Sequence, residues 1–468
     1  QKPHGPMKRY ATLALSLCLL MLSGTALAQT ARFSEAPAMN AFARALAVSD
    51  GTVLIGEPNN PHQPGLVHVY EKGDEGTWDA PTQLQASDGV VGDNFGRALA
   101  TDGDWALVGA PSQSEGNGAA YLFQRSDDGA WVEAARLAPP DTVEGSGFGS
   151  SVAFNGTVAL VGAPRQGGGT GVVHAFRRAD DGTWTREAAL SGSEAGEQSF
   201  FGAALLVDDA VALVGAPRQG DGAVYAFGYD EAAGAWSETE VLTADGVSGQ
   251  ARFGSALAHQ DGTVLIGAPR HDAGAGAVFS YQQDAEGAWA QQSRLMAFDG
   301  DRGHQFGAAM AVDGDDMWIG APGASSRRGT LYRYTHDPAG ATWLSAQKLS
   351  GPEQKQGDQF ASTVAVGDDL AVVGLTGTDY GAGTAAIFER DAEGAWAVQT
   401  TVIGEKSPVL SAVTGEQVDC TEGEANQFGC NNVDLVSFLP LDQIGAERGV
   451  RVNDIWGWTD PQTGREYA

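Results

Sequence analysis

A repeat of about 53 residues runs through most of this chain and limits what it can fold into. Seven phenylalanines mark successive copies 52 to 54 residues apart, at Phe42, Phe95, Phe148, Phe201, Phe253, Phe306 and Phe360. Seven tryptophans follow with the same spacing, at Trp78, Trp131, Trp184, Trp236, Trp289, Trp343 and Trp396. Because two independent sets of aromatic residues agree, the chain contains seven copies of one structural unit.

The third copy shows what each unit contains. Its apolar runs predict four β-strands, at residues 149–154, 157–162, 171–177 and 184–190. Asn155-Gly156, between the first two strands, is typical of a type I′ hairpin turn. No run in the unit has the 3.6-residue periodicity of a helix.

Seven antiparallel four-stranded units predict an all-β fold, a seven-bladed β-propeller. Closing the ring removes the sheet edges that an open array would expose. The propeller is expected over residues 42–403, with blades starting near residues 42, 95, 148, 201, 253, 306 and 360. Since one blade cannot bury both its faces alone, we expect the Phe and Trp rings to fill the space between blades.

These units resemble FG-GAP repeats, the blades of the integrin α-chain propeller and of many bacterial surface proteins. The resemblance rests on a Phe-Gly pair followed by Gly-Ala-Pro, as in Phe148-Gly149 with Gly162-Ala163-Pro164. It weakens in the outer copies, where Phe42-Ala43 and Phe360-Ala361 replace the Phe-Gly pair. The resemblance implies the propeller fold and a place at the cell surface.

The calcium site of that family is not expected to carry over. Calcium-binding blades join their first two strands by a D-x-D-x-D-G-type loop, which supplies an oxygen cage. Here the connection is a tight turn, such as Asn155-Gly156, Asp208-Asp209 or Gly314-Asp315-Asp316. One or two carboxylates cannot surround Ca²⁺, so we predict turn formers, with no metal and no cofactor.

The N-terminal segment has the features of an export signal. Met7 is the expected start, followed by Lys8, Arg9 and the apolar run 11–21. An A-x-A site ends at Ala28, which predicts cleavage before Gln29. A lipoprotein signal at Cys18 is the alternative, although the preceding Leu17 is large for such a site. Residues 1–28 are therefore assigned to the signal and upstream residues, and residues 29–41 to a lead-in, with export through Sec to the periplasm, cell surface or medium.

The segment after the repeats differs in kind. Residues 404–468 are interpreted as a short irregular linker and the truncated start of a second domain. The stretch from Cys430 through Pro461 resembles the opening of the choice-of-anchor B proteins, whose second propeller is built from LVIvD repeats. Cys420 and Cys430 form an even pair in an exported chain, so we expect a disulfide.

Charge excludes some partners. The whole chain carries a net charge of −31, and loss of Lys2, Lys8 and Arg9 with the signal lowers it to −34. A surface this acidic repels nucleic acid and anionic lipid. No apolar run outside the signal is long enough to span a membrane. The protein is expected to be a monomer.

One group of residues could form a binding site. The loop between the second and third strands carries cations in successive units, at Arg165, Arg218, Arg270, His271, Arg327 and Arg328. They could hold an acidic glycan or partner carboxylates through bidentate arginines. The competing interpretation is that they pair with acids of nearby inter-blade loops: Asp141, Glu144, Glu194, Glu197, Asp245 and Asp299.

No catalytic motif appears in the sequence. Nucleophile elbow, P-loop, HExxH and Rossmann patterns are missing, and the equivalent third-strand positions of His68 and His174 favour packing. We therefore predict a non-catalytic propeller that binds an extracellular protein or glycan. The alternatives are an enzyme or enzyme-accessory domain with its site at the propeller axis, and a scaffold that presents a missing C-terminal propeller.

Overall fold

The protein is described by a computed structural model. It covers residues 41–404 except 61–62, 74–75, 79–80, 142, 209, 248, 261, 285–286, 338–341 and 368, together with residues 418–419, 421, 424–425, 428–429, 458–459 and 466–467. The predicted signal peptide, the predicted lead-in up to residue 40, and Cys420 and Cys430 lie outside the described residues. After residue 404 the structure describes two short pairs, β29 (Glu424–Ala425) with β30 (Phe428–Gly429) and β31 (Trp458–Thr459) with β32 (Glu466–Tyr467).

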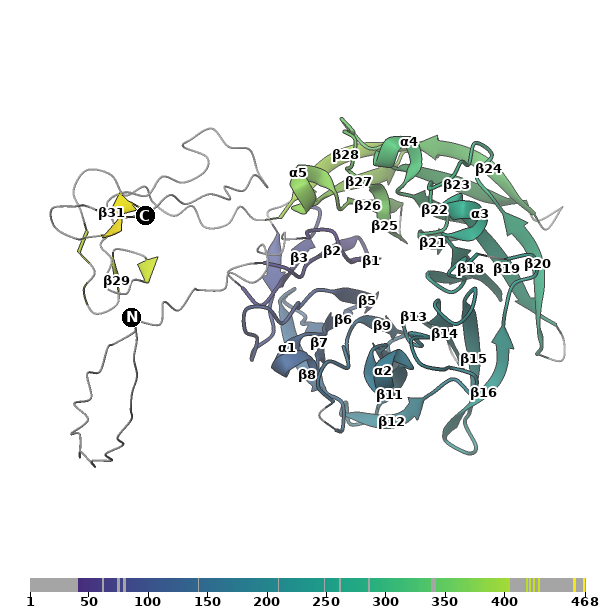
Figure 1. The fold of residues 1–468 in the computed structure, drawn as a ribbon, viewed down its shortest axis with the longest axis horizontal. Coiled ribbons are helices and arrows are strands. Elements are labelled where there is room, and N and C mark those ends of the chain that lie inside the picture. The colour runs from purple at the N-terminus through teal and green to yellow at the C-terminus, as the bar shows by residue number, and fades with distance from the viewer. Residues whose placement is uncertain are drawn as a thin grey trace, which may run out of the picture. The chain divides into compact units, whose positions relative to one another are not determined.

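Seven four-stranded antiparallel sheets form the blades of a β-propeller, as predicted (Figure 1). The innermost strands are β1 (Leu46–Ser49), β5 (Ala98–Asp102), β9 (Ser151–Phe154), β13 (Ala204–Asp208), β17 (Leu257–Gln260), β21 (Ala309–Asp313) and β25 (Phe360–Gly367). The second strands are β2 (Thr52–Glu57), β6 (Trp105–Ala110), β10 (Val158–Ala163), β14 (Val211–Ala216), β18 (Thr263–Ala268), β22 (Asp316–Ala321) and β26 (Leu370–Leu375).

The outer half of each blade follows in sequence order. The third strands are β3 (Leu66–Tyr70), β7 (Ala119–Arg125), β11 (Val172–Arg178), β15 (Ala223–Asp230), β19 (Ala277–Gln283), β23 (Thr330–Asp337) and β27 (Thr384–Arg390). The outermost strands are β4 (Thr82–Leu84), β8 (Trp131–Leu137), β12 (Trp184–Leu190), β16 (Ala235–Leu242), β20 (Trp289–Leu295), β24 (Thr342–Leu349) and β28 (Trp396–Ile403). In the third blade the observed strands differ from the predicted ones by no more than two residues at either end.

Five of the loops between second and third strands contain a single tight turn drawn as a helix. These are α1 (Gln113–Gly116), α2 (Gln166–Gly169), α3 (His271–Gly274), α4 (Ala324–Arg327) and α5 (Thr378–Gly381). Their inner residues have left-handed backbone angles, for example φ 62° at Gly167 and φ 47° at Asp272. They are therefore left-handed turns, which explains why the sequence shows no helical periodicity.

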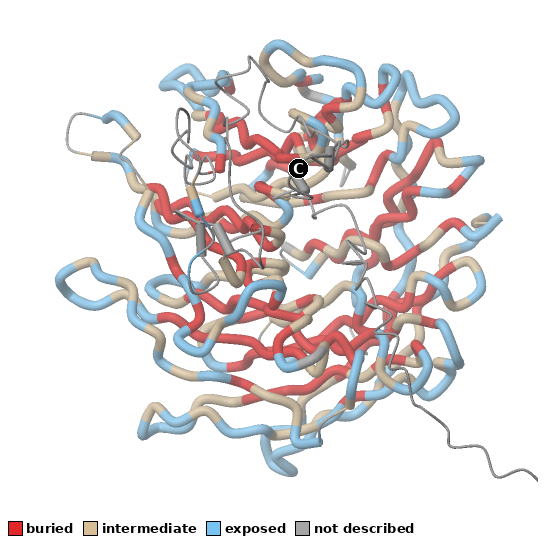
Figure 2. Tube along the Cα trace, turned by 60° about the vertical axis from the view of Figure 1, so that its left-hand side comes forward, coloured by how far each residue is buried: buried red, intermediate tan, exposed pale blue. Residues whose placement is uncertain are grey.

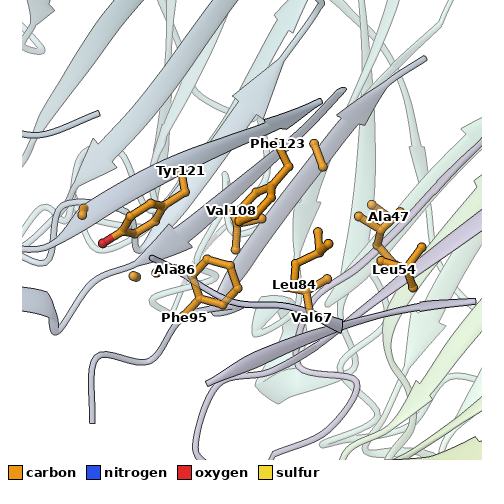
Figure 3. Packing of buried hydrophobic residues seen from close by; sticks show 13 residues of the cluster. Ala47, Leu54, Val67, Leu84, Ala86, Phe95, Val108, Tyr121 and Phe123 are labelled. Carbon is orange, nitrogen blue, oxygen red and sulfur yellow. The ribbon is translucent and has the colours of Figure 1, made fainter. Parts of the chain in front are cut away.

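The seven repeat phenylalanines fill the space between blades. All seven are fully buried. Figure 3 shows Phe95 among Val67 and Leu84 of the first blade and Tyr121 and Phe123 of its own blade. The Phe95 ring lies edge-on to Tyr121, with centroids 5.7 Å apart. Burying such a ring contributes about 1.5–3 kcal/mol, which confirms its predicted role.

The repeat tryptophans are less buried than the phenylalanines. Trp289 and Trp396 are buried, whereas Trp131 and Trp184 are half-buried. Trp184 still contacts Trp105 of the preceding blade, with ring centroids 6.2 Å apart. The difference follows from position, because the outermost strand has solvent on one side. Figure 2 shows the buried residues concentrated along the strands and the exposed ones in the loops.

The prediction of a type I′ turn at Asn155-Gly156 was wrong. The backbone amide of Asn155 donates to the carbonyl of Val158, and the amide of Val158 donates to the side-chain Oδ1 of Asn155. The two central residues of the turn are therefore Gly156 and Thr157. Of these, Gly156 alone has a positive φ, at 80°, whereas type I′ requires it at both. The pattern matches type II′, in which Gly stands first. Asp50 and Gly51 in the first blade do have positive φ at both central positions.

The ring is closed by contacts between the first and last blades. The backbone amide of Phe42 donates to the carbonyl of Ala382 at 3.0 Å. Thr363 Oγ1 donates to the carbonyl of Ala43 at 2.7 Å. All four strands of the last blade are consecutive in the chain, so closure depends on packing and these bonds instead of a strand borrowed from the N-terminus.

Candidate functional site

Three of the predicted arginines occupy one repeated position at an end of the propeller. The backbone amides of Arg165, Arg218 and Arg270 donate to the carbonyls two residues before the motif phenylalanine, at 3.1, 3.3 and 3.0 Å. The same bond in the sixth blade is made by Gly323, at 3.0 Å. We call Arg165, Arg218 and Arg270 the rim arginines, and their side chains are exposed.

The other predicted cations lie elsewhere. Arg327 and Arg328 come four and five residues after Gly323, at the far end of α4, and are exposed. His271 is buried and lies edge-on to Phe279, with ring centroids 6.1 Å apart. The structure thus brings three of the six predicted residues to equivalent positions, whereas Arg327 and Arg328 occupy other positions of the same kind of loop and the side chain of His271 is buried.

Each rim arginine faces the residue that precedes the motif phenylalanine in its own blade. The Arg165 guanidinium carbon lies 3.8 Å from where a Cβ of Gly147 would be. The Arg218 guanidinium lies 4.2 Å from the centre of the Phe200 ring, a cation–π distance. In the fifth blade the equivalent residue is Arg252, whose pKa is lowered by burial and then by the charges of Arg270 and Arg218.

Two further arginines, Arg44 and Arg97, belong to the same end of the molecule. We call them the mouth arginines, and each stands two residues after a motif phenylalanine, just before an innermost strand. Burial lowers the pKa of Arg44. Burial, followed by the charges of Arg44 and Arg165, lowers the pKa of Arg97 to about 10. Neither these two arginines nor Arg252 was predicted from the sequence, although each stands at a fixed offset from a motif phenylalanine.

No carboxylate neutralises these six arginines among the residues that the structure describes. The ion pairs found there involve other cations, such as Arg136 with Asp88 and Lys348 with Asp299. Asp299 also accepts from the Tyr332 hydroxyl at 2.7 Å. The interpretation that the rim arginines pair with acids of nearby loops is therefore wrong, because those acids lie beyond ion-pair distance or bind other groups.

A cavity of about 290 Å³ lies on the propeller axis next to the mouth arginines. Its wall comes from the first residues of all seven innermost strands. The aliphatic members, which we call the axial ring, are Leu46, Leu99, Val152, Leu205, Leu257, Met310 and Val364. Ala45 and Ala98, which follow Arg44 and Arg97 directly, also line it.

Two acids at the turns between first and second strands contact basic side chains nearby. Asp208 pairs with His259 of the next blade at 2.8 Å, and Asp316 pairs with Arg333 of its own blade at 2.7 Å. Within the described part of the chain, no group of three His, Cys, Asp or Glu side chains is placed to hold a metal ion. Asp208 and Asp316 thus have side-chain partners in the propeller, and the absence of a metal at these turns stays a prediction.

Comparison with known proteins identifies the repeat. The family model described as FG-GAP repeat matches residues 78–123, 131–176, 236–281 and 289–334. These four segments match FG-GAP repeats. Each matched FG-GAP segment begins at or next to the outermost strand of one blade and ends in the third strand of the next, so the family unit is offset from the blade.

The chain is also similar to a curated protein. Integrin alpha-M of Mus musculus is 25% identical over 305 residues, which are 62% of this chain and 22% of that protein. The chain thus spans about a fifth of the length of this relative. The choice-of-anchor B resemblance of the C-terminal segment stays a prediction.

Two solved structures share the fold. A protein from Lactobacillus plantarum superposes with a TM-score of 0.52 at 17% identity, covering 75% of this chain and 96% of its own. A protein from Bacteroides uniformis, provisionally assigned as a 6-phosphogluconolactonase, gives a TM-score of 0.53 at 13% identity with the same coverage.

A separate property concerns membranes: none of the helices in the described residues is long and apolar enough to span one.

Proposed function

We propose that this FG-GAP propeller is an exported, non-catalytic binding protein that holds an anionic extracellular protein or glycan against the rim arginines. The observation that carries the proposal is that Arg165, Arg218 and Arg270 occupy one repeated position and have no carboxylate partner among the described residues, on a chain of net charge −31. The resemblance to integrin α-chain propellers, and the similarity to mouse integrin alpha-M, support an extracellular place.

The physical argument is electrostatic. An acidic surface repels most anions, so an anionic ligand gains affinity only where positive charge is concentrated. Guanidinium groups can bind carboxylate or sulfate oxygens in pairs of parallel hydrogen bonds. The positive charges of Arg252 and Arg270 repel each other in the free protein, and a bound anion would reduce this repulsion. Each charged hydrogen bond of this kind contributes about 1.5–3 kcal/mol.

Binding to an array of acidic glycans and to acidic peptides tests the proposal, with the chain from Gln29 onward. The variant Arg165→Ala/Arg218→Ala/Arg270→Ala is expected to weaken binding at least 100-fold. A matched control, Arg302→Ala/Arg327→Ala/Arg328→Ala, removes the same charge from exposed positions outside the rim and is expected to stay within threefold. Equal losses in both variants, or none in either, would contradict a site at the rim, provided both keep the wild-type melting temperature.

An enzyme with its site on the axis is the second candidate. The observation that favours it is the axial cavity beside Arg44 and Arg97, where an anionic substrate could enter. The likeness to the Bacteroides uniformis protein concerns the fold alone at 13% identity. Hydrolysis of a phosphorylated sugar lactone that is abolished in Arg44→Ala/Arg97→Ala would favour the enzyme, whereas binding without turnover favours the first candidate.

A further inference from the structure

The fifth blade carries an arginine at both of two positions that face each other. Arg270 is its rim arginine, and Arg252 precedes its motif phenylalanine. In the fourth blade the same positions hold Arg218 and Phe200, whose guanidinium and ring centre lie 4.2 Å apart. The residue before the motif phenylalanine has a left-handed φ of 55–67° in all seven blades, so its side chain leaves the backbone in the same direction each time. Arg252 therefore faces Arg270, as the Phe200 ring faces its rim arginine.

A third guanidinium reaches this place from the preceding blade. The backbone amide of Phe253 donates to the carbonyl of Asp221 at 3.0 Å. This bond holds Arg252, the residue before Phe253, beside the fourth-blade loop that contains Arg218. Burial, followed by the charges of Arg270 and Arg218, lowers the pKa of Arg252. We call Arg218, Arg252 and Arg270 the arginine triad.

No carboxylate offsets the charge of the arginine triad in the described part of the chain. None of the ion pairs found there includes a member of the triad. Asp221 and Asp272 are the acids nearest to it in sequence, and Asp221 Oδ1 accepts a hydrogen bond from the backbone amide of Gln250 at 2.7 Å. Three positive charges thus converge without compensation, on a chain of net charge −31.

The fold does not require an arginine at position 252. Gln305 and Gln359 hold this position in the sixth and seventh blades, with φ of 61° and 55° against 58° at Arg252. A neutral side chain is therefore compatible with the same backbone. Bringing three like charges together costs free energy in the folded protein, and a bound anion offsets that cost. Recognition of an anion thus accounts for Arg252 better than packing does.

We propose that the arginine triad binds a tetrahedral oxyanion, the sulfate or phosphate ester of a glycan, in preference to a carboxylate. A carboxylate has two oxygens, which one guanidinium can engage in full. A sulfate or phosphate ester presents three terminal oxygens, one for each member of the triad. Arg218 and Arg270 are exposed and Arg252 is half-buried, so the site is open to a ligand from solvent. This inference rests on the proposed function, since it names the group held at the same rim, and it adds Arg252 as the residue that sets specificity.

Calorimetric titration of the chain from Gln29 onward with three sugars tests the inference. Glucose 6-sulfate, glucose 6-phosphate and glucuronate share one ring and carry the anionic group at carbon 6. Both esters are expected to bind saturably, and about 10-fold more tightly than glucuronate. Tighter binding of the phosphate would identify a phosphorylated glycan as the source of the group, and tighter binding of the sulfate a sulfated one. Equal affinity for all three sugars, or no saturable binding of either ester, would overturn the inference.

Two single variants then locate the site. Arg252→Gln is expected to lower the affinity for the esters about 10-fold and to change that for glucuronate by at most about threefold. Arg302→Gln, the matched control, removes the same charge from an exposed loop outside the triad and is expected to leave ester affinity within about twofold. Glutamine occurs at the position of Arg252 in two other blades, so the variant is expected to keep the wild-type melting temperature. Unchanged ester binding by folded Arg252→Gln, or an equal loss in Arg302→Gln, would overturn the inference.

Failure of this inference is distinguishable from failure of the proposed function. Acidic ligands that depend on the rim arginines but bind as carboxylates as tightly as they do as esters would overturn the inference and leave the proposed function standing. Acidic ligands whose binding does not depend on the rim arginines would overturn both.

Discussion

The backbones of Gly109 and Gly149 lie directly against each other across the boundary between the second and third blades. A Cβ atom added to Gly109 would be 2.0 Å from the carbonyl oxygen of Gly149. Gly162 and Gly202 repeat this contact at the next boundary, at 2.4 Å. The glycines of Phe-Gly and of Gly-Ala-Pro thus meet between neighbouring blades, and this contact explains why both motifs recur together.

Gly109→Ala is expected to destabilise the propeller by about 1–3 kcal/mol, because real Cβ atoms do not approach backbone oxygen so closely and the blades must move apart. Gly196→Ala is the matched control, since a Cβ there meets nothing within 4 Å and its φ is not in the left-handed region. It is expected to stay within about 0.5 kcal/mol of wild type. Urea unfolding measures both, and equal stability of the two variants would contradict the close contact.

Phe148→Ala is expected to cost about 3–5 kcal/mol, because the ring is fully buried between blades and its removal leaves a cavity. Trp184→Ala is expected to cost less although the side chain is larger, since it lies half-exposed on the outermost strand. Chemical denaturation of the two variants gives the order. A greater loss for Trp184→Ala would show that the outer layer of the blades contributes more than burial indicates.

Glu57 and His68 form a buried pair in the first blade, with Oε2 and Nε2 2.7 Å apart. Glu57 stands where the middle blades have the Ala of Gly-Ala-Pro, so Glu57→Ala is sterically acceptable. It nevertheless removes the partner of a buried imidazole and is expected to cost about 3 kcal/mol.

A double variant isolates this coupling. Phe279 holds the position of His68 in the fifth blade, so Glu57→Ala/His68→Phe restores an apolar contact there and is expected to recover at least half of the loss. Unfolding free energies of the two single variants and the double variant measure the coupling. A double variant as unstable as the sum of the singles would argue against it.

His174 makes stability depend on pH. Burial, and then the charge of Arg186, lowers the pKa of His174 to about 4, whereas a histidine in the unfolded chain titrates near 6.5. As pH falls, the unfolded chain takes up the proton first. The contribution of neutral His174 is therefore complete above about pH 6.5 and is lost as the pH falls toward 4.

His174→Phe removes this titration. Between pH 7 and pH 4 the stability of the wild type is expected to fall by about 3 kcal/mol relative to His174→Phe. Denaturant unfolding at several pH values in that range measures the difference. A constant difference across the range would mean that His174 takes up its proton equally readily in the folded state.

The strand positions were predictable because they depend on local chemistry. In the third blade the predicted and observed strands nearly coincide, since apolar runs and turn residues such as Gly182 specify a strand and its end wherever it lies. The turn at Asn155 was predicted less well, because Asn-Gly fits two registers of the hairpin and only pairing with Val158 selects one.

The repeat in the sequence by itself determined seven blades, their antiparallel strands and the burial of residues such as Phe148, because each property belongs to a unit and its period. The tertiary structure decided which arginines lie near one another and that, among the described residues, no carboxylate pairs with them. Arg97 is brought near Arg44 and Arg165, and Arg252 near Arg218, only when neighbouring blades pack against each other, since each of these pairs joins residues of successive blades. Charge interactions depend on distance in space, and a pattern along the chain does not contain that distance.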